Sequence, residues 1–469
     1  MPNANVKSLL LGNGININFG GRAYTNQFII KRIIFNARAD KYAPLFNGEI
    51  SGQEIANLFS ELAKWANDIR NGKYDGLIEE EDIPVLESFK TRYNWELKRY
   101  YEVGLEDWFF ILHVYFLVNP DLADSWISAK QGFEHMMVDA IYNDGKIQEL
   151  YTTMGKFMKR FFQSYENIFT LNYDNNIEKL THGNVIHLHG DYLTPANSEN
   201  PKTIQGYIRE QQGERVVIPN FEHCYCDALF DYNGEHKYDI ARAFAKGEEG
   251  LADLEKAHVP ASTLPTPISI LIKVHKEHPE LSFGVQYHFS LLEGLTGELH
   301  IIGLSPNNDS HIFRLIDNSA VTKVVFYYHS ESDKQLHLHK PVEYKKVDDL
   351  WKALNVAPKK FNCRYHIPDT EEADEFLKVF NELSADPVSK ETLKAEIDAI
   401  PQFTVDKLCE MVHEKLIEQK SNGSPKDEDD LMRQFREVSR IALREGVMPS
   451  ALYAHVIMNA SKWKTDSNA

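Results

Sequence analysis

Short continuous runs of apolar residues alternate with amphipathic stretches along this chain. The runs have the length of buried parallel strands, and stretches at 175–180 and 310–318 between them have helical spacing. Two βαβ units are therefore predicted, and with them an α/β fold built on a Rossmann-like parallel sheet. The predicted strands lie at 6–11, 167–171, 185–189, 299–304 and 321–328.

A long helical insertion is expected between the first two strands, at about 51–162. Apolar residues recur there at helical spacing, and Ser51-Gly-Gln-Glu54 resembles a capping box. The apolar run Trp108 to Val118 is shorter than the roughly 20 residues that a transmembrane helix needs, which favours a core helix.

The remaining segments differ in composition. Residues from about 192 to 267 are polar and rich in proline, which predicts an irregular insertion that could cap a site. Helical patterns return beyond about residue 345, and 418–430 has the composition of a linker. We therefore expect a sheet domain at 1–345 and a helical C-terminal module at 346–469.

Charge and cysteine content narrow the class of protein. The 469 residues carry a net charge of −18, which argues against a broad nucleic-acid surface because neutralising phosphates requires clustered Lys and Arg. Four cysteines are too few for a disulfide framework, and the first residues do not resemble a secretion signal. These features predict a cytoplasmic protein that does not enter a membrane.

Polar clusters follow four of the predicted strands. In open α/β sheets, ligands bind at the carboxyl ends of the strands, where glycine backbone and helix N-termini approach phosphate groups. Four such clusters on one sheet predict one nucleotide site. The clusters are Gly12-Asn13-Gly14-Ile15-Asn16, Thr170-Leu171-Asn172-Tyr173-Asp174, His187-Leu188-His189-Gly190-Asp191 and Gly303-Leu304-Ser305.

Each cluster also has a structural alternative. Gly12 and Gly14 could form a plain tight turn, and the third glycine and acidic ribose partner of the standard dinucleotide fingerprint are missing. Asn172 and Asp174 could cap the following helix. Strand alternation predicts that His187 and His189 share a face, but only His189 lies at the strand end beside a glycine, so His189 is the functional candidate.

In their order, the four clusters resemble the motifs of sirtuin-like NAD-consuming domains, especially the divergent bacterial branch associated with antiphage defence. The resemblance spans roughly residues 6 to 330. The Gly-Asn-Gly start, followed by Gly20 and Tyr24, is also similar to the AbiH abortive-infection family. Asn16 stands where sirtuins carry serine, and Gly21-Arg22-Ala23-Tyr24 replaces their arginine-containing element.

This resemblance implies an NAD+ hydrolase that releases nicotinamide and ADP-ribose and acts in abortive infection by depleting NAD+. Asn172 would orient the attacking water or the nicotinamide ribose, and His189 would be the general base. Asp174 would help to seat the nicotinamide. The other residues implied in NAD+ binding are Gly12, Asn13, Gly14, Asn16, Gly303 and Ser305.

Two other functions remain open. An NAD-dependent protein deacylase is weakened by the absence of the paired Cys-x-x-Cys motifs that hold zinc in deacylating sirtuins. His223-Cys224-Tyr225-Cys226 is the one cluster with metal-like residues, and its spacing does not favour zinc, so no metal is predicted. The third function is a non-catalytic nucleotide-sensing subunit.

Partners follow from the same resemblance. A non-catalytic sensing subunit would signal to a partner such as a HerA-type ATPase. An NAD+ hydrolase that is toxic to its own cell has to be held inactive, which favours a homo-oligomer gated by assembly and a phage-derived trigger.

Overall fold

A computed structural model describes residues 6–48, 50–213, 217–230, 235–256, 266–306, 308–336, 338–356, 389 and 439–448. Backbone contacts divide the chain into two compact units. Unit 1 comprises Met1–Asn16, Ala43–Ile50 and Asn57–Val356, and unit 2 comprises Ile17–Tyr42, Ser51–Ala56 and Ala357–Ala469. The domain boundary expected at 345 stays a prediction. The linker expected at 418–430, and most of the expected helical module, lie outside the described residues.

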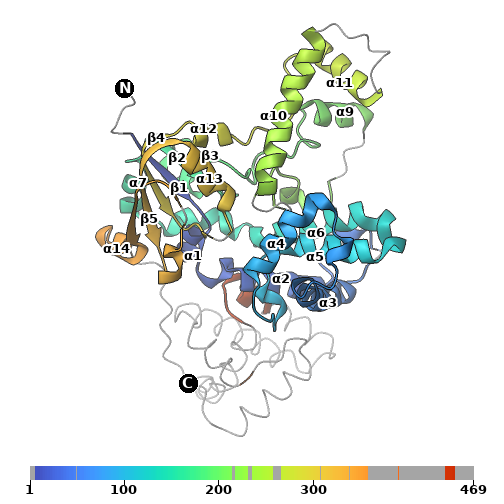
Figure 1. Ribbon diagram of the computed structural model, residues 1–469, viewed down its shortest axis with the longest axis horizontal. Coiled ribbons are helices and arrows are strands. Elements are labelled where there is room, and N and C mark those ends of the chain that lie inside the picture. The colour runs from blue at the N-terminus through green and yellow to red at the C-terminus, as the bar shows by residue number, and fades with distance from the viewer. Residues whose placement is uncertain are drawn as a thin grey trace, which may run out of the picture. The chain divides into compact units, whose positions relative to one another are not determined.

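Unit 1 contains a six-stranded sheet in the order β3-β2-β1-β4-β5-β6 (Figure 1). Every pairing is parallel, which confirms the Rossmann-like α/β fold. The sixth strand was not predicted, because Val-Glu-Tyr-Lys-Lys contains only two apolar residues. The strands are β1 (Lys7–Leu11), β2 (Asn167–Thr170), β3 (Ile186–His187), β4 (Thr296–Ile302), β5 (Ala320–Tyr328) and β6 (Val342–Lys346).

The central strands are buried on both faces. Leu9, Leu10 and Leu11 of β1 have no exposed surface, as expected for the middle of a parallel sheet covered by helices. One face packs on α12 (Phe289–Glu293) and α13 (Ser310–Asn318). The strand register aligns one apolar side chain from each strand in that core: Ile186, Phe169, Leu10, Ile301, Phe326 and Tyr344.

Helices fill the chain between β1 and β2, in agreement with the predicted helical insertion. Ser51 precedes α3 as predicted: Glu54 N donates to Ser51 Oγ (3.3 Å), and Ser51 N donates to Glu54 Oε2 (2.8 Å). The helix α5 buries Trp108 completely. The helices are α1 (Gly14–Gly20), α2 (Asn26–Arg38), α3 (Gly52–Arg70), α4 (Ile83–Arg92), α5 (Asp107–Val118), α6 (Trp126–Tyr142) and α7 (Lys156–Phe162), with a 3-10 segment, η7 (Lys146–Thr153).

The segment from 192 to 267 differs from the irregular chain expected there. It contains α9 (Ile204–Gln212), α10 (Glu235–Lys256) and the start of α11 (Thr266–Glu277), which lie side by side in Figure 1 around Ile204, Leu251 and Ile272. The prolines that suggested irregular chain lie outside these helices, except Pro267 in the first turn of α11, where proline is tolerated.

Two short helices complete unit 1. They are α8 (Asn176–Thr181), which connects β2 to β3, and α14 (Val347–Ala353), which follows β6. None of the helices in the described part of the chain combines the length and the apolar composition needed to cross a bilayer.

Candidate functional site

Hydrogen bonds join the ends of four strands into one edge of the sheet. Gly12 N donates to Ile302 O of β4 (3.0 Å), and Asn172 Nδ2 donates to Gly12 O (3.2 Å). His187 Nδ1 lies 2.9 Å from Asn172 O, which connects β3 to the same group. The clusters predicted from the sequence therefore converge at the carboxyl ends of β3, β2, β1 and β4, and the strand order reverses between β1 and β4.

The glycines of this edge permit a close backbone approach between β1 and β4. Gly14 N donates to Gly303 O (3.0 Å), and a Cβ on Gly14 would lie 2.5 Å from Gly303 Cα. Gly303 itself has a φ of +78°, which favours glycine. The amides of Gly12 and Gly14, expected to face a pyrophosphate, thus donate to carbonyl groups of β4 and its following turn.

A second link joins the loops after β1 and β2. Asn16 Nδ2 donates to Asp174 Oδ2 (2.7 Å), and both side chains are buried. Asp174 Oδ1 also accepts from the backbone N (3.2 Å) and Nδ2 (2.5 Å) of Asn176. Burial raises the pKa of Asp174, although these donors stabilise its charged form. Asp174 therefore accepts from the first amide of α8, which is close to its structural alternative, and also fixes Asn16.

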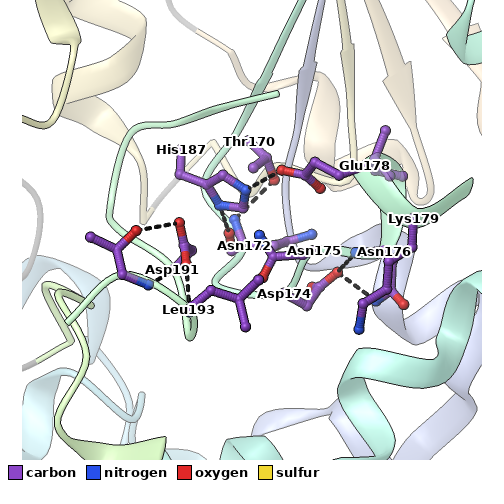
Figure 2. Close-up of polar contacts among 12 residues, drawn as sticks. Thr170, Asn172, Asp174, Asn175, Asn176, Glu178, Lys179, His187, Asp191 and Leu193 are labelled. Atoms are coloured by element: carbon purple, nitrogen blue, oxygen red, sulfur yellow. Dashed lines mark hydrogen bonds and ion pairs between the residues drawn. The ribbon is translucent and has the colours of Figure 1, made fainter. Parts of the chain in front are cut away.

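The His187 ring lies between α8 and the end of β2 (Figure 2). Its Nε2 is 2.6 Å from Glu178 Oε1, while Nδ1 faces Asn172 O. Burial opposes protonation, but the hydrogen bond to Glu178 and its charge raise the pKa of His187 above the ordinary value. With both ring nitrogens engaged, His187 holds the Asn172 backbone in place, which agrees with the structural role expected for it.

His189 is buried in a different environment, so the predicted shared face is wrong. The strand β3 ends at His187, and alternation does not continue to His189. His189 Nε2 lies 3.1 Å from His311 Nε2 in α13, and the two rings are nearly parallel with centroids 5.3 Å apart. Burial, then the charge of Lys237, lowers the pKa of His189 well below its usual value, so the ring is neutral at neutral pH.

Charged side chains from both insertions surround this histidine pair. Lys237 of α10, only 3 % exposed, donates to Glu106, which immediately precedes α5. Burial raises the pKa of Glu106 to about 7 and that of Asp309, at the start of α13, to about 6. The charge of Lys237 opposes both shifts. The helical insertion, the α9–α11 segment and the sheet therefore meet beside His189.

The α9–α11 segment is also fixed to the chain just after His189. Leu229 N donates to His189 O (2.9 Å), and Asp191 N donates to Asp227 Oδ1 (2.7 Å). A Cβ on Gly190, whose φ is +82°, would lie 2.3 Å from Asp227 O. The close approach of the Asp227 backbone therefore requires a residue without Cβ at position 190. Burial raises the pKa of Asp227 to about 7.

Ser305 and Asn13 lie at the more open part of the edge. Ser305 is partly exposed and begins the turn into α13, where its backbone N donates to Asp309 Oδ2 (3.3 Å). Asn13 is exposed in the turn after β1. The structure therefore brings together the predicted residues at one edge, with Asn13, Asn172 and Ser305 more accessible than Asn16, Asp174 and His189.

Sequence reasoning missed His311, Lys237 and Glu106. Each lies far along the chain from His189, and none belongs to a local motif. The only signal in the sequence was the polar turn that precedes His311.

The cluster at 223–226, whose residue types resemble metal ligands, makes other contacts. His223 Nε2 lies 3.0 Å from Asp139 Oδ1, and Cys224 Sγ donates to His135 O. Within the described residues, no three His, Cys, Asp or Glu are arranged to hold a metal ion.

Comparison of the chain with models of known protein families, with curated proteins and with solved structures finds no match.

Proposed function

We propose that this protein binds NAD+ at the carboxyl edge of its sheet and hydrolyses the bond between nicotinamide and ribose. One observation carries the proposal: four motif-bearing strand ends are joined by hydrogen bonds where the strand order reverses. In sheets of the order 3-2-1-4-5-6, dinucleotides bind across this point. The resemblance of the four motifs to sirtuin-like domains selects NAD+ among the dinucleotides.

The chemistry requires positioning more than acid catalysis, because nicotinamide is already a cationic leaving group. Water attacks the ribose C1′, the C1′–N bond breaks, and its electron pair leaves with neutral nicotinamide. The water proton passes to a base. In this proposal half-buried Asn172 orients the water or the ribose, and His189 accepts the proton. The lowered pKa of His189 keeps the resting ring neutral, which is the form that a general base needs before the reaction.

Binding of the rest of NAD+ is assigned to the neighbouring turns. Asp174, held by Asn16, would seat the nicotinamide, and Gly303 would line the approach. Since the amides of Gly12 and Gly14 already donate to β4 and its turn, polar contacts to phosphate or ribose would come mainly from Asn13 and Ser305. In this assignment, all the proposed residues lie at one edge of the sheet. Local donors bind the phosphates, because a chain with a net charge of −18 does not attract an anion through its overall charge.

The test measures nicotinamide release from NAD+ by the purified full chain, alone and with candidate activating partners. Asn172→Ala and His189→Ala are expected to lower turnover by about two orders of magnitude or more. Asn184→Ala is a matched control, because Asn184 is exposed in the loop before β3. Turnover that is unchanged in both site variants would remove these residues from the mechanism, and the absence of nicotinamide under every condition would contradict hydrolysis.

A non-catalytic nucleotide-sensing subunit is the second candidate, and the burial of His189 favours it. The ring is 2 % exposed and its Nε2 is paired with His311. Binding of NAD+ by calorimetry without any product over hours would establish this function instead. Turnover that depends on an acyl-lysine peptide would identify a deacylase.

The proposed biological role is that of an antiphage effector acting by NAD+ depletion. A homo-oligomer, a HerA-type ATPase partner and a phage-derived trigger belong to this proposal. Cellular NAD+ is expected to fall after phage challenge in cells with the intact protein and to stay constant in cells with Asn172→Ala.

A further inference from the structure

His189 is paired with His311, a residue that belongs to none of the four motifs. His311 is 1 % exposed, its ring lies nearly parallel to that of His189 at an interplanar angle of 17°, and Phe289 contacts both rings. His311 lies in the first turn of α13, while His189 follows β3, so the contact joins the two halves of the sheet edge.

Both rings of this pair are neutral. A 3.1 Å contact between two Nε2 atoms requires one to donate and the other to accept, so the donating ring carries its proton on Nε2 and the accepting ring carries its proton on Nδ1. Burial, followed by the charges of Lys237 and Arg314, lowers the pKa of His311 to about 3. In the resting protein, protonation of either ring would place a cation beside existing cations, so the resting pair is neutral.

The pair also selects which nitrogen of His189 is available. With Nε2 of His189 bound to His311, Nδ1 is the nitrogen left for a ligand, and among the described residues it has no hydrogen-bond partner. A hydrogen-bonded partner that fixes the orientation and tautomer of an imidazole is a recurrent device in acid–base sites.

We propose that His311 is a positioning residue that accepts a hydrogen bond from Nε2 of His189 and so holds the His189 ring in a single orientation and tautomer, with the lone pair of Nδ1 presented to the substrate. This inference rests on the proposed NAD+ hydrolysis. His311 does not contact the substrate in this arrangement, and it acts through the ring that does.

The first experiment compares His311→Phe with His311→Gln in the full chain. Phenylalanine keeps an aromatic ring and removes the hydrogen bond, whereas the carboxamide oxygen of glutamine can accept near the position of Nε2. In His311→Phe, kcat is expected to fall by between about ten- and a hundredfold, with KM for NAD+ changed by less than about threefold. His311→Gln is expected to recover most of the lost kcat.

His135→Phe is the matched control, because His135 is also a buried histidine but contacts Tyr225 in a separate part of unit 1. This variant shows how far the replacement of a buried histidine by phenylalanine changes kcat by itself. Its kcat is expected to equal that of the parent protein. A His311→Phe variant that keeps the parent kcat, or a His311→Gln variant as impaired as His311→Phe, would overturn the positioning role.

A second measurement does not depend on turnover. In ¹⁵N-histidine NMR spectra of the ligand-free protein, His189 is expected to show one fixed tautomer in the parent and His311→Gln, and a mixture in His311→Phe. A fixed tautomer in His311→Phe would overturn the inference. If the parent shows a fixed tautomer lost in His311→Phe but releases no nicotinamide, the pairing stands and the proposed hydrolysis fails.

Discussion

At the scale of single residues, the motifs identified Asn172, Asp174 and His189, but not the residues that control them. Asn172 and Asp174 lie in one short segment after a strand, so local sequence was enough to select them. The partner of His189 lies 122 positions away, and Lys237 reaches the same region from α10. Contacts made by distant segments decide the charge states here, and a single sequence does not contain that information.

The buried carboxyl group of Asp227 predicts a pH-dependent stability. Its pKa rises from about 3.9 in the unfolded chain to about 7 in the folded protein, so the folded state binds the extra proton between these values. This contribution to stability is complete below the unfolded pKa and is lost as the pH rises through 7. Asp227→Asn removes the titration while its side-chain oxygen can still accept from Asp191 N.

We expect the unfolding free energy of Asp227→Asn, relative to the parent, to increase by about 2 kcal/mol between pH 5 and pH 8. Urea unfolding at both pH values measures this change. The other buried titrating groups are shared by the two proteins and largely cancel in the difference. A difference independent of pH would show that Asp227 does not titrate in this range.

At the scale of elements, regular segments were predicted well and their contacts were not. The helix α13 has the predicted bounds of 310 and 318, because it is short, amphipathic and preceded by a polar turn. The strand β6 was missed because three of its five residues are charged, and α10 because prolines elsewhere in its segment suggested irregular chain. The glycines of the first motif are predicted to contact a ligand, and the structure adds a close backbone contact with Gly303 that the motif does not indicate.

The contact between Gly14 and Gly303 predicts a strong effect of a single methyl group. Gly14→Ala would place Cβ 2.5 Å from Gly303 Cα, which forces the turns after β1 and β4 apart. We expect a loss of about 1–3 kcal/mol in unfolding free energy and weaker NAD+ binding. In the control Gly250→Ala, the new Cβ meets nothing within 4 Å in helix α10, so stability should stay equal or rise slightly.

Denaturant unfolding and calorimetric titration with NAD+ measure the two effects of Gly14→Ala. A Gly14→Ala protein as stable as the parent would mean that the turn relaxes easily. Normal stability combined with normal binding would remove this turn from the proposed NAD+ site.

At the scale of the whole molecule, unit 2 combines segments from opposite ends of the chain. Arg32 is 4 % exposed, and its Nη2 donates to Ala23 O (2.7 Å) and to Leu443 O (3.4 Å). Ala442 and Leu443 are buried, and a Cβ on Gly446 would lie 2.7 Å from Ala23 N. Residues 439–448 therefore complete the packing around residues 17–42, and no pattern in the sequence predicts this pairing.

This arrangement predicts that the C-terminal residues are needed for the stability of unit 2. A chain ending at Val356 loses the apolar groups of Ala442 and Leu443 and one acceptor of the buried Arg32 guanidinium. Uncovering buried side chains and leaving a buried charge with fewer partners each cost several kcal/mol. The shortened chain is expected to melt at a lower temperature, and a separately expressed 357–469 fragment should bind it and restore the melting temperature.

Leu443→Ala in the full chain separates packing from the rest of the C-terminal segment. It removes a buried side chain but keeps the backbone acceptor of Arg32, so a loss of about 2–5 kcal/mol in unfolding free energy is expected. Co-purification and thermal unfolding measure the complementation by the fragment. If the shortened chain melts like the full chain and does not bind the fragment, the C-terminal residues are dispensable for unit 2. They would then be available for a role in the proposed homo-oligomer.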